Sequence, residues 1–283
     1  MKIFTYIIYF CIVSFSPIQA KNNSSCDKNQ EVCVISQKKL SNSYHFTAIN
    51  NTPHIVSIYI DIDSENMQSN KSFPIKLVLK AKSKLKVAHL RIIKTNQKSG
   101  FKISYSWMHG SYIATSNNFS YKFPYKLNTS HKVGQGFNTK KTHQGLDKYA
   151  IDWNMTIGTP IHAARSGYVI DFKQDSNTGG KTKKFMDKAN YIKILHRDGS
   201  IGVYAHLKYN GVMVKKGKYI SQGSLIGYSG NTGFSTGPHL HFHVAKPAIR
   251  NGKIVELTMP VKFSNCKTPK SFTPQEGKKY ISC

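Results

Sequence analysis

The stretch "GPHLHFHV", residues 237–244, places three histidines at alternate positions: His239, His241 and His243. Alternation is the period of a β-strand, so the three imidazoles are expected to leave one face of the strand. The apolar residues between them would leave the opposite face, toward a core. Histidine binds zinc and transfers protons near neutral pH, so this strand is a candidate site for metal-assisted chemistry.

Further histidines and carboxylates stand beside glycines in "THQGLDKYAIDW" and "YAHL". A zinc hydrolase needs three protein ligands, an open position for water and a group that transfers protons near the working pH. Only 13 Asp and Glu occur in 283 residues, which favours a histidine over a glutamate as the base. The HExxH helix motif is absent. Four glycines between 227 and 237 permit tight loops that bring "PHLH" under an open groove.

These motifs resemble those of the M23 (lysostaphin/LytM-like) zinc metallopeptidases. The resemblance covers residues 130–247 and is carried by "GYSGNTGFSTGPHLHFHV", "YAHL" and "THQGLDKYAIDWNMTIGTPIHAARSGYVI". It implies a compact antiparallel β fold with an open groove. It also implies one zinc ion per chain, held by His, Asp and His, and cleavage of peptide cross-links or stem peptides of bacterial peptidoglycan.

Carried over by position, the resemblance makes His143 of "THQG" the first zinc ligand and His241 the last. His239 becomes a catalytic histidine that faces the substrate oxyanion and water. His206 of "YAHL" becomes the other catalytic histidine and the expected general base.

Two aspartates compete for the remaining ligand position. Asp147 fits the H-x3-D spacing usual in the family, in "HQGLD". Asp152 instead stands at the family's distance before the "GTP" turn, in "DWNMTIGTP". We favour Asp152 as the ligand, with Asp147 in a longer loop, and keep Asp147 as the alternative.

Three more residues are candidates for the substrate groove. Asn190 matches a family asparagine near the groove, although asparagine is common at strand starts. Tyr204 is expected on the same strand face as His206, near the groove, although the sequence agrees equally well with a buried structural tyrosine. His243 stands where the family usually has glutamate, and we expect it on the groove wall or directly behind the metal ligands, with plain exposed surface as the alternative to a functional role.

The elements that position these residues are expected to be strands. Residues 34–125 contain alternating β-branched and aromatic runs such as "HIVSIYIDI" and "FKISYSWMHG", which predict a small antiparallel β-sandwich. The second half also contains short strand-like runs and little helical periodicity. The predicted class is all-β, divided as a signal peptide (1–20), an N-terminal β domain that is regulatory or wall-binding (21–128), an M23-like catalytic domain (129–255) and a surface tail (256–283).

The first twenty residues, "MKIFTYIIYFCIVSFSPIQA", have the layout of a secretory signal peptide. A membrane anchor is the alternative, and no later stretch is long and apolar enough to span a bilayer. Four cysteines then remain, and we expect local disulfides Cys26–Cys33 and Cys266–Cys283, as in exported proteins. A four-thiolate metal site is the alternative, but the CxxC spacing is missing. The protein is therefore predicted to be periplasmic or extracellular.

The chain is strongly basic, with 41 Lys and Arg and a formal net charge of +28. This charge favours attraction to an anionic cell-wall or envelope surface, although a generally basic proteome would explain it as well. No nucleic-acid motif is present, so nucleic acid is not the expected partner. A non-catalytic wall-binding protein, or an activator of another hydrolase, remains the alternative to an enzyme.

Overall fold

The computed structural model describes residues 9–11, 23–40, 42–115, 119–139, 141–266 and 268–283. Over this part of the chain the regular elements are strands and two short 3-10 helices, Gly145–Asp147 and Lys183–Lys188. The prediction of an all-β protein is confirmed. No helix in the described ranges is long and apolar enough to cross a membrane. The expected signal segment, 1–20, lies outside the described residues except for Tyr9–Cys11.

The chain forms two compact units. The N-terminal unit runs to Tyr112 and also includes the later segment Pro247–Val255. The C-terminal unit contains Ile113–Lys246 and Glu256–Cys283. The segment 256–283, expected as a surface tail, therefore belongs to the C-terminal unit, to which it contributes three strands.

The N-terminal unit contains two antiparallel sheets. Their inner faces share one cluster of buried apolar residues, which includes Val34, Phe46, Ile58 and Ile60. The alternating runs seen in the sequence supply these side chains, since every second residue of a strand reaches the same face. In spatial order, the first sheet contains β2 (Asn23–Cys26), β3 (Val32–Leu40), β4 (Ser43–Asn50), β8 (Ser83–Ile92) and β6 (Met67–Ser69). The second sheet contains β1 (Tyr9–Cys11), β9 (Gly100–His109), β5 (Val56–Glu65) and β7 (Ile75–Leu79).

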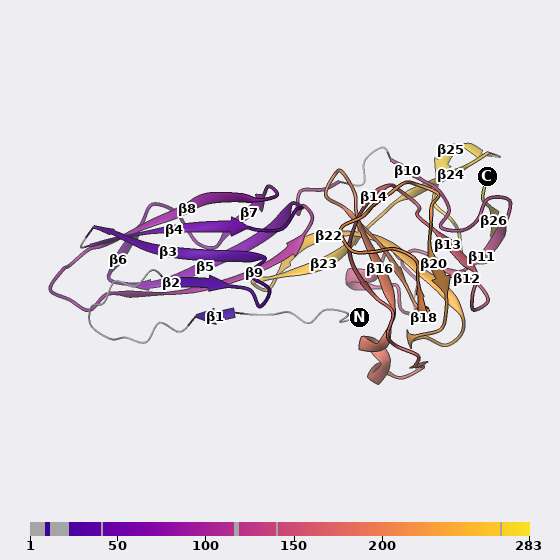
Figure 1. Ribbon diagram of the computed structural model, residues 1–283, viewed down its shortest axis with the longest axis horizontal. Helices are drawn as coiled ribbons and strands as arrows, with labels where there is room; N and C mark the ends of the chain where they lie inside the picture. Colours follow the sequence, from indigo (N-terminus) through magenta and orange to yellow (C-terminus); the bar gives the residue numbers. More distant parts are fainter. Residues whose placement is uncertain (1–8, 12–22, 41, 116–118, 140, 267) are drawn as a thin grey trace. The chain divides into compact units, whose positions relative to one another are not determined.

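The C-terminal unit is built on one nine-stranded antiparallel sheet (Figure 1). Its strands are β19 (Tyr219–Ile220), β14 (Gly167–Lys173), β16 (Tyr191–Leu195), β17 (Ile201–Ala205), β22 (His239–Arg250), β12 (Ile151–Asn154), β11 (Ser130–Gln135) and β26 (Lys279–Ile281), with β23 (Lys253–Met259) pairing to β22. One smaller sheet contains β13 (Pro160–His162), β20 (Leu225–Ser229) and β18 (Leu207–Val212), and another contains β10 (Ser120–Tyr121), β24 (Lys262–Asn265) and β25 (Thr268–Phe272). A further small sheet pairs β15 (Gly179–Gly180) with β21 (Gly233–Phe234).

The core of this unit is rich in aromatic side chains. Phe123 stacks on Tyr125 and Phe263, and Trp153 meets Phe123 edge-on. Strand β22 contributes its apolar face, because the three residues that alternate with its histidines are fully buried in this cluster: Leu240, Phe242 and Val244. The histidines therefore leave the other face of β22, as the alternation predicts.

Both expected disulfides are formed. Cys26 and Cys33 are cross-strand partners in β2 and β3, and they are bonded to each other. Cys266 is bonded to Cys283, at the end of the chain. With all four thiols in disulfides, the alternative of a four-thiolate metal site is excluded.

Candidate active site and metal centre

Strand register brings Asp152 directly opposite His241. The two residues are Cα partners in the antiparallel pair of β12 and β22. Directly opposite side chains on one face lie close together, so the pairing itself sets their distance. His241 Nδ1 lies 2.9 Å from Asp152 Oδ1. Residues far apart in sequence thus form half of the candidate site.

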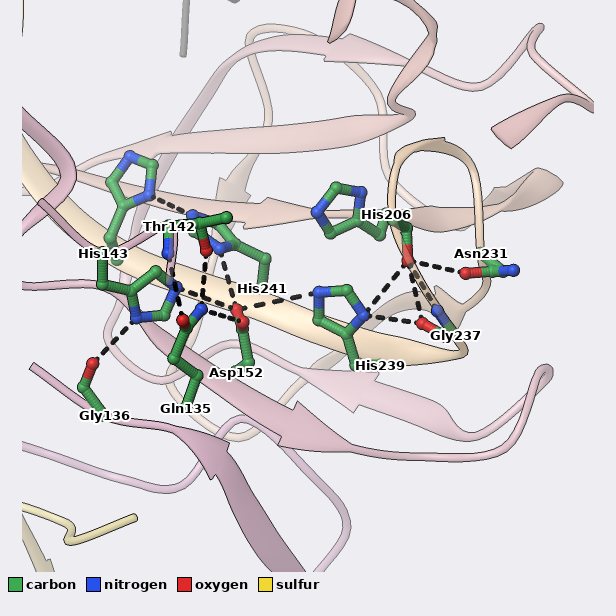
Figure 2. Close-up of polar contacts among 12 residues, drawn as sticks. Gln135, Gly136, Thr142, His143, Asp152, His206, Asn231, Gly237, His239 and His241 are labelled. Atoms are coloured by element: carbon green, nitrogen blue, oxygen red, sulfur yellow. Dashed lines mark hydrogen bonds and ion pairs between the residues drawn. The ribbon is translucent and has the colours of Figure 1, made fainter. Parts of the chain in front are cut away.

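His143 reaches the same carboxylate from the segment between β11 and β12. Its Nδ1–H donates to the carbonyl of Gly136 at 2.8 Å, which leaves the lone pair on Nε2. Nε2 is buried without a hydrogen-bond partner and lies 3.2 Å from Asp152 Oδ1. Figure 2 shows both histidines turned toward Asp152.

The donor set fits a zinc ion. One ligand atom from each of His143, Asp152 and His241 lies within 4.8 Å of the other two. Imidazole nitrogen and carboxylate oxygen are common zinc ligands, and three protein ligands leave a fourth position for water. The orphaned Nε2 of His143 has the lone pair that such an ion requires. Asp147 ends the 3-10 helix Gly145–Asp147 and is not part of this group.

Asp152 is held in place by a side chain that the sequence did not reveal. Gln135 of β11 donates from Nε2 to Asp152 Oδ2 at 2.9 Å and to Thr142 Oγ1 at 2.7 Å. This leaves Oδ1 to face the histidines. Burial alone would raise the pKa of Asp152, but the adjacent imidazoles of His143 and His241 hold it well below its usual value. The carboxylate is therefore ionised.

His206 lies just beyond the end of β17. Its backbone has a φ of 63°, in the left-handed region that non-glycine residues seldom adopt. Its Nδ1–H donates to the carbonyl of Thr232 at 2.7 Å, so the lone pair is on Nε2. Burial, followed by the charges of His239 and His241, lowers the pKa of His206 to about 3. The ring is therefore neutral near pH 7.

His239 lies beside His206, with their ring centroids 4.6 Å apart (Figure 2). Its Nδ1–H donates to the carbonyl of Gly237 at 2.8 Å. Its Nε2 is 3.7 Å from Asp152 Oδ1. Two histidines thus adjoin the candidate ligand set without belonging to it.

A pocket opens over these residues. The two histidines and the three candidate ligands line it together. Its walls include Met155, Phe234 and the pair Lys183 and Met186 from the second 3-10 helix. Apolar and basic walls around a polar centre are typical of a ligand-binding site.

Two residues expected in the substrate groove do not line this pocket. Tyr204 is fully buried in the core, and its hydroxyl accepts a hydrogen bond from the backbone N–H of Ala164 at 2.8 Å. Asn190 is also fully buried, and its side chain bonds the backbone N–H and carbonyl of Ser176. Their polar groups are engaged inside the fold, and neither side chain lines the pocket.

His243 lies directly behind His241, rather than on the groove wall or on exposed surface. Its exposed fraction is 2%. Its Nδ1 is 3.0 Å from His241 Nε2, and its Nε2 is 2.9 Å from Glu256 Oε1. Glu256 also pairs with Lys193, and the sequence had indicated neither residue.

A model of peptidase family M23 matches residues 146–256. That range contains Asp152, His206, His239 and His241, and His143 lies just before it. Residues 146–256 therefore belong to peptidase family M23.

Among M23 relatives, "Peptidoglycan DD-endopeptidase ShyA" of Vibrio cholerae is 32% identical over 124 residues, which are 42% of this chain and 26% of the relative. "Lysostaphin" of Staphylococcus staphylolyticus is 42% identical over 96 residues, which are 33% and 18%. The matches therefore span less than a third of each relative. A solved structure of lysostaphin from Staphylococcus simulans aligns with 44% of this chain and 47% of its own at 35% identity, with a TM-score of 0.33.

Proposed function

We propose that this chain is an exported zinc-dependent endopeptidase that cleaves peptide cross-links or stem peptides of bacterial peptidoglycan. The proposal is carried by the convergence of His143, Asp152 and His241, whose donor atoms lie within 4.8 Å of one another. Two further histidines stand beside them in one pocket. The name of ShyA, a relative that matches the M23 segment, supports peptidoglycan as the substrate.

His206 is the proposed general base. Zinc in a three-ligand site lowers the pKa of its bound water to about 7 and polarises a carbonyl. His206 is neutral and presents the Nε2 lone pair, because Nδ1–H is engaged by Thr232. It accepts the proton at Nε2 as water attacks the scissile carbonyl, a role that contributes about 10²–10⁴-fold to rate.

His239 is the proposed partner of the developing oxyanion and the leaving amine. Its Nδ1–H is engaged by the carbonyl of Gly237, so it donates toward substrate only from Nε2. That donation requires the ring to carry both protons. A preorganised donor at this position stabilises charge that appears only in the transition state.

Export and targeting complete the proposal. Disulfides persist in oxidising compartments, which supports a periplasmic or extracellular location. The N-terminal β unit is proposed to regulate the enzyme or bind the wall, and the net charge of +28 to attract anionic envelope polymer.

The deciding experiment is digestion of purified peptidoglycan by the full-length protein. We expect new peptide termini, identified by mass spectrometry, that disappear when a chelator removes the metal. His206→Ala should keep its zinc and cleave about 10²–10⁴-fold more slowly. His162→Ala is a matched control, because His162 is a half-buried histidine of the same unit that does not line the pocket.

A wall-binding protein without catalysis would give a different result. Zinc-loaded protein would then bind peptidoglycan but release no new termini from any preparation, and the enzyme proposal would fail. The presence of all three candidate ligands and both adjacent histidines argues against that outcome.

A further inference from the structure

The ring of His243 connects a candidate zinc ligand to a buried ion pair. His243 Nδ1 is 3.0 Å from His241 Nε2, and His243 Nε2 is 2.9 Å from Glu256 Oε1. Lys193 Nζ lies 2.9 Å from the other oxygen, Glu256 Oε2. These groups form one continuous hydrogen-bonded chain that ends at the candidate metal centre.

Strand pairing builds this chain. Lys193 of β16 pairs with Val203 of β17, and Val203 pairs with His243 of β22. Glu256 comes from β23, the strand that pairs with β22 on this unit's sheet. The groups thus sit on rigid strands, where side-chain positions are more exact than on loops.

The Lys193–Glu256 pair is deeply buried, with side-chain exposures of 6% and 10%. Burial alone would raise the pKa of Glu256, but Lys193 first and then His243 lower it to about 2. The glutamate is therefore a carboxylate near neutral pH, and a carboxylate only accepts hydrogen bonds. Buried charges of this kind are costly unless they are paired and hydrogen-bonded, which implies a use for them.

Because the Glu256 carboxylate only accepts, His243 donates to it from Nε2–H. A His241 that binds a metal through Nδ1 carries its proton on Nε2, and His243 Nδ1, 3.0 Å away, is placed to accept it. That tautomer leaves the lone pair of His241 on Nδ1, which lies 2.9 Å from Asp152 Oδ1, where the three donors converge.

We infer that His243, backed by Glu256 and Lys193, is a positioning residue that fixes the ring orientation and tautomer of His241 for metal binding. The inference rests on the proposed zinc site and assigns three residues outside the ligand set to its support. Partners behind a metal-binding histidine typically contribute about 10–100-fold to metal affinity or activity.

The test is a zinc titration of metal-stripped, full-length protein against a competing chelator. His243→Leu removes the acceptor, and we expect zinc to bind about 10–100-fold more weakly. His243→Gln keeps a side-chain oxygen that accepts from His241, so its affinity should lie much nearer that of the wild type. His196→Leu is the matched control, because His196 is an equally buried histidine of this unit outside the site, and its affinity should be unchanged.

Cobalt substitution supplies a second measurement. We expect the visible absorption spectrum of bound Co²⁺ to change in His243→Leu and to be unchanged in the control, because the geometry of one ligand is altered. If His243→Leu fails to fold, the double variant Glu256→Gln/Lys193→Met replaces it. That variant removes both buried charges together, and it should also weaken zinc binding.

The outcomes separate this inference from the proposed function. If wild-type protein binds no zinc, the proposed function itself fails. If wild-type protein binds zinc and the folded variants bind it equally well with an unchanged cobalt spectrum, only the positioning role is overturned.

Discussion

Asp152 and Asp147 both follow His143 closely in sequence, yet only Asp152 belongs to the group that meets two histidines. Asp147 ends a 3-10 helix and lines the same pocket, outside that group. The short sequence pattern H-x3-D therefore points to a carboxylate outside the group of converging donors. The decisive feature is the pairing of β12 with β22, which places Asp152 opposite His241.

The two aspartates give the first prediction. Asp152→Ala should weaken zinc binding by more than about 100-fold and should abolish peptidoglycan cleavage. The loss of a ligand should exceed the loss of a residue that only supports a ligand, which typically costs about 10–100-fold. Asp147→Ala is the matched control and should keep most of both. Zinc content by elemental analysis, with thermal unfolding to check the fold, measures the difference. Loss of metal from Asp147→Ala alone would reverse the assignment.

Some residues of the candidate site could be predicted from the sequence, and others could not. The proximity of His206, His239 and His241 was predictable because each lies in a short motif, "YAHL" or "GPHLH", that resembles the M23 pattern. Tyr204 was misplaced because the alternation of β17 ends before His206, whose backbone enters the left-handed region. Gln135 and Glu256 gave no signal, because their roles depend on which strands pair.

At the scale of elements, the two faces of strand β22 have different roles in the C-terminal unit. One face supplies apolar side chains to the aromatic core, and the other supplies the three histidines. The all-β class and the faces of this strand follow from the alternation of residues. The order of the nine strands does not, because distant segments such as β11 and β26 pair without a local sequence signal.

The end of β16 carries a buried histidine that gives the second prediction. Burial first, opposed by a hydrogen bond to Ser166 and adjusted by Arg165 and Asp198, lowers the pKa of His196 to about 4. The unfolded chain, with an ordinary value near 6.5, binds a proton more readily between these values. The stability due to neutral His196 is therefore complete above about pH 6.5 and is lost as the pH falls toward 4.

Urea unfolding at neutral pH and at about pH 5 measures this effect. Over that interval His196 becomes protonated mainly in the unfolded chain, which should lower the free energy of unfolding of the wild type by on the order of 2 kcal/mol. His196→Gln should lose less stability over the same interval, whatever its stability at neutral pH. Equal losses in both proteins would show that His196 does not titrate as proposed.

At the scale of the whole molecule, the net charge of +28 gives the third prediction. Binding to anionic sacculi should weaken as salt rises from about 0.01 M to about 1 M, because the Debye length falls from about 30 Å to about 3 Å. Pelleting of His206→Ala with sacculi measures binding without digestion. Chitin, a neutral polysaccharide, is the control. Binding that is insensitive to salt would contradict an electrostatic attraction.

The C-terminal strand also has a consequence for the timing of folding. Lys279–Ile281 pairs with Ser130–Lys132, so the nine-stranded sheet is completed by residues that lie far downstream in the sequence. Ribosomes add about 5–20 residues per second, so these partners emerge roughly 7–30 s apart. During that interval this edge of β11 lacks its final neighbour, and an unpaired edge invites pairing with other chains. The unit that carries the candidate site therefore reaches its complete sheet only after these downstream residues have been synthesised.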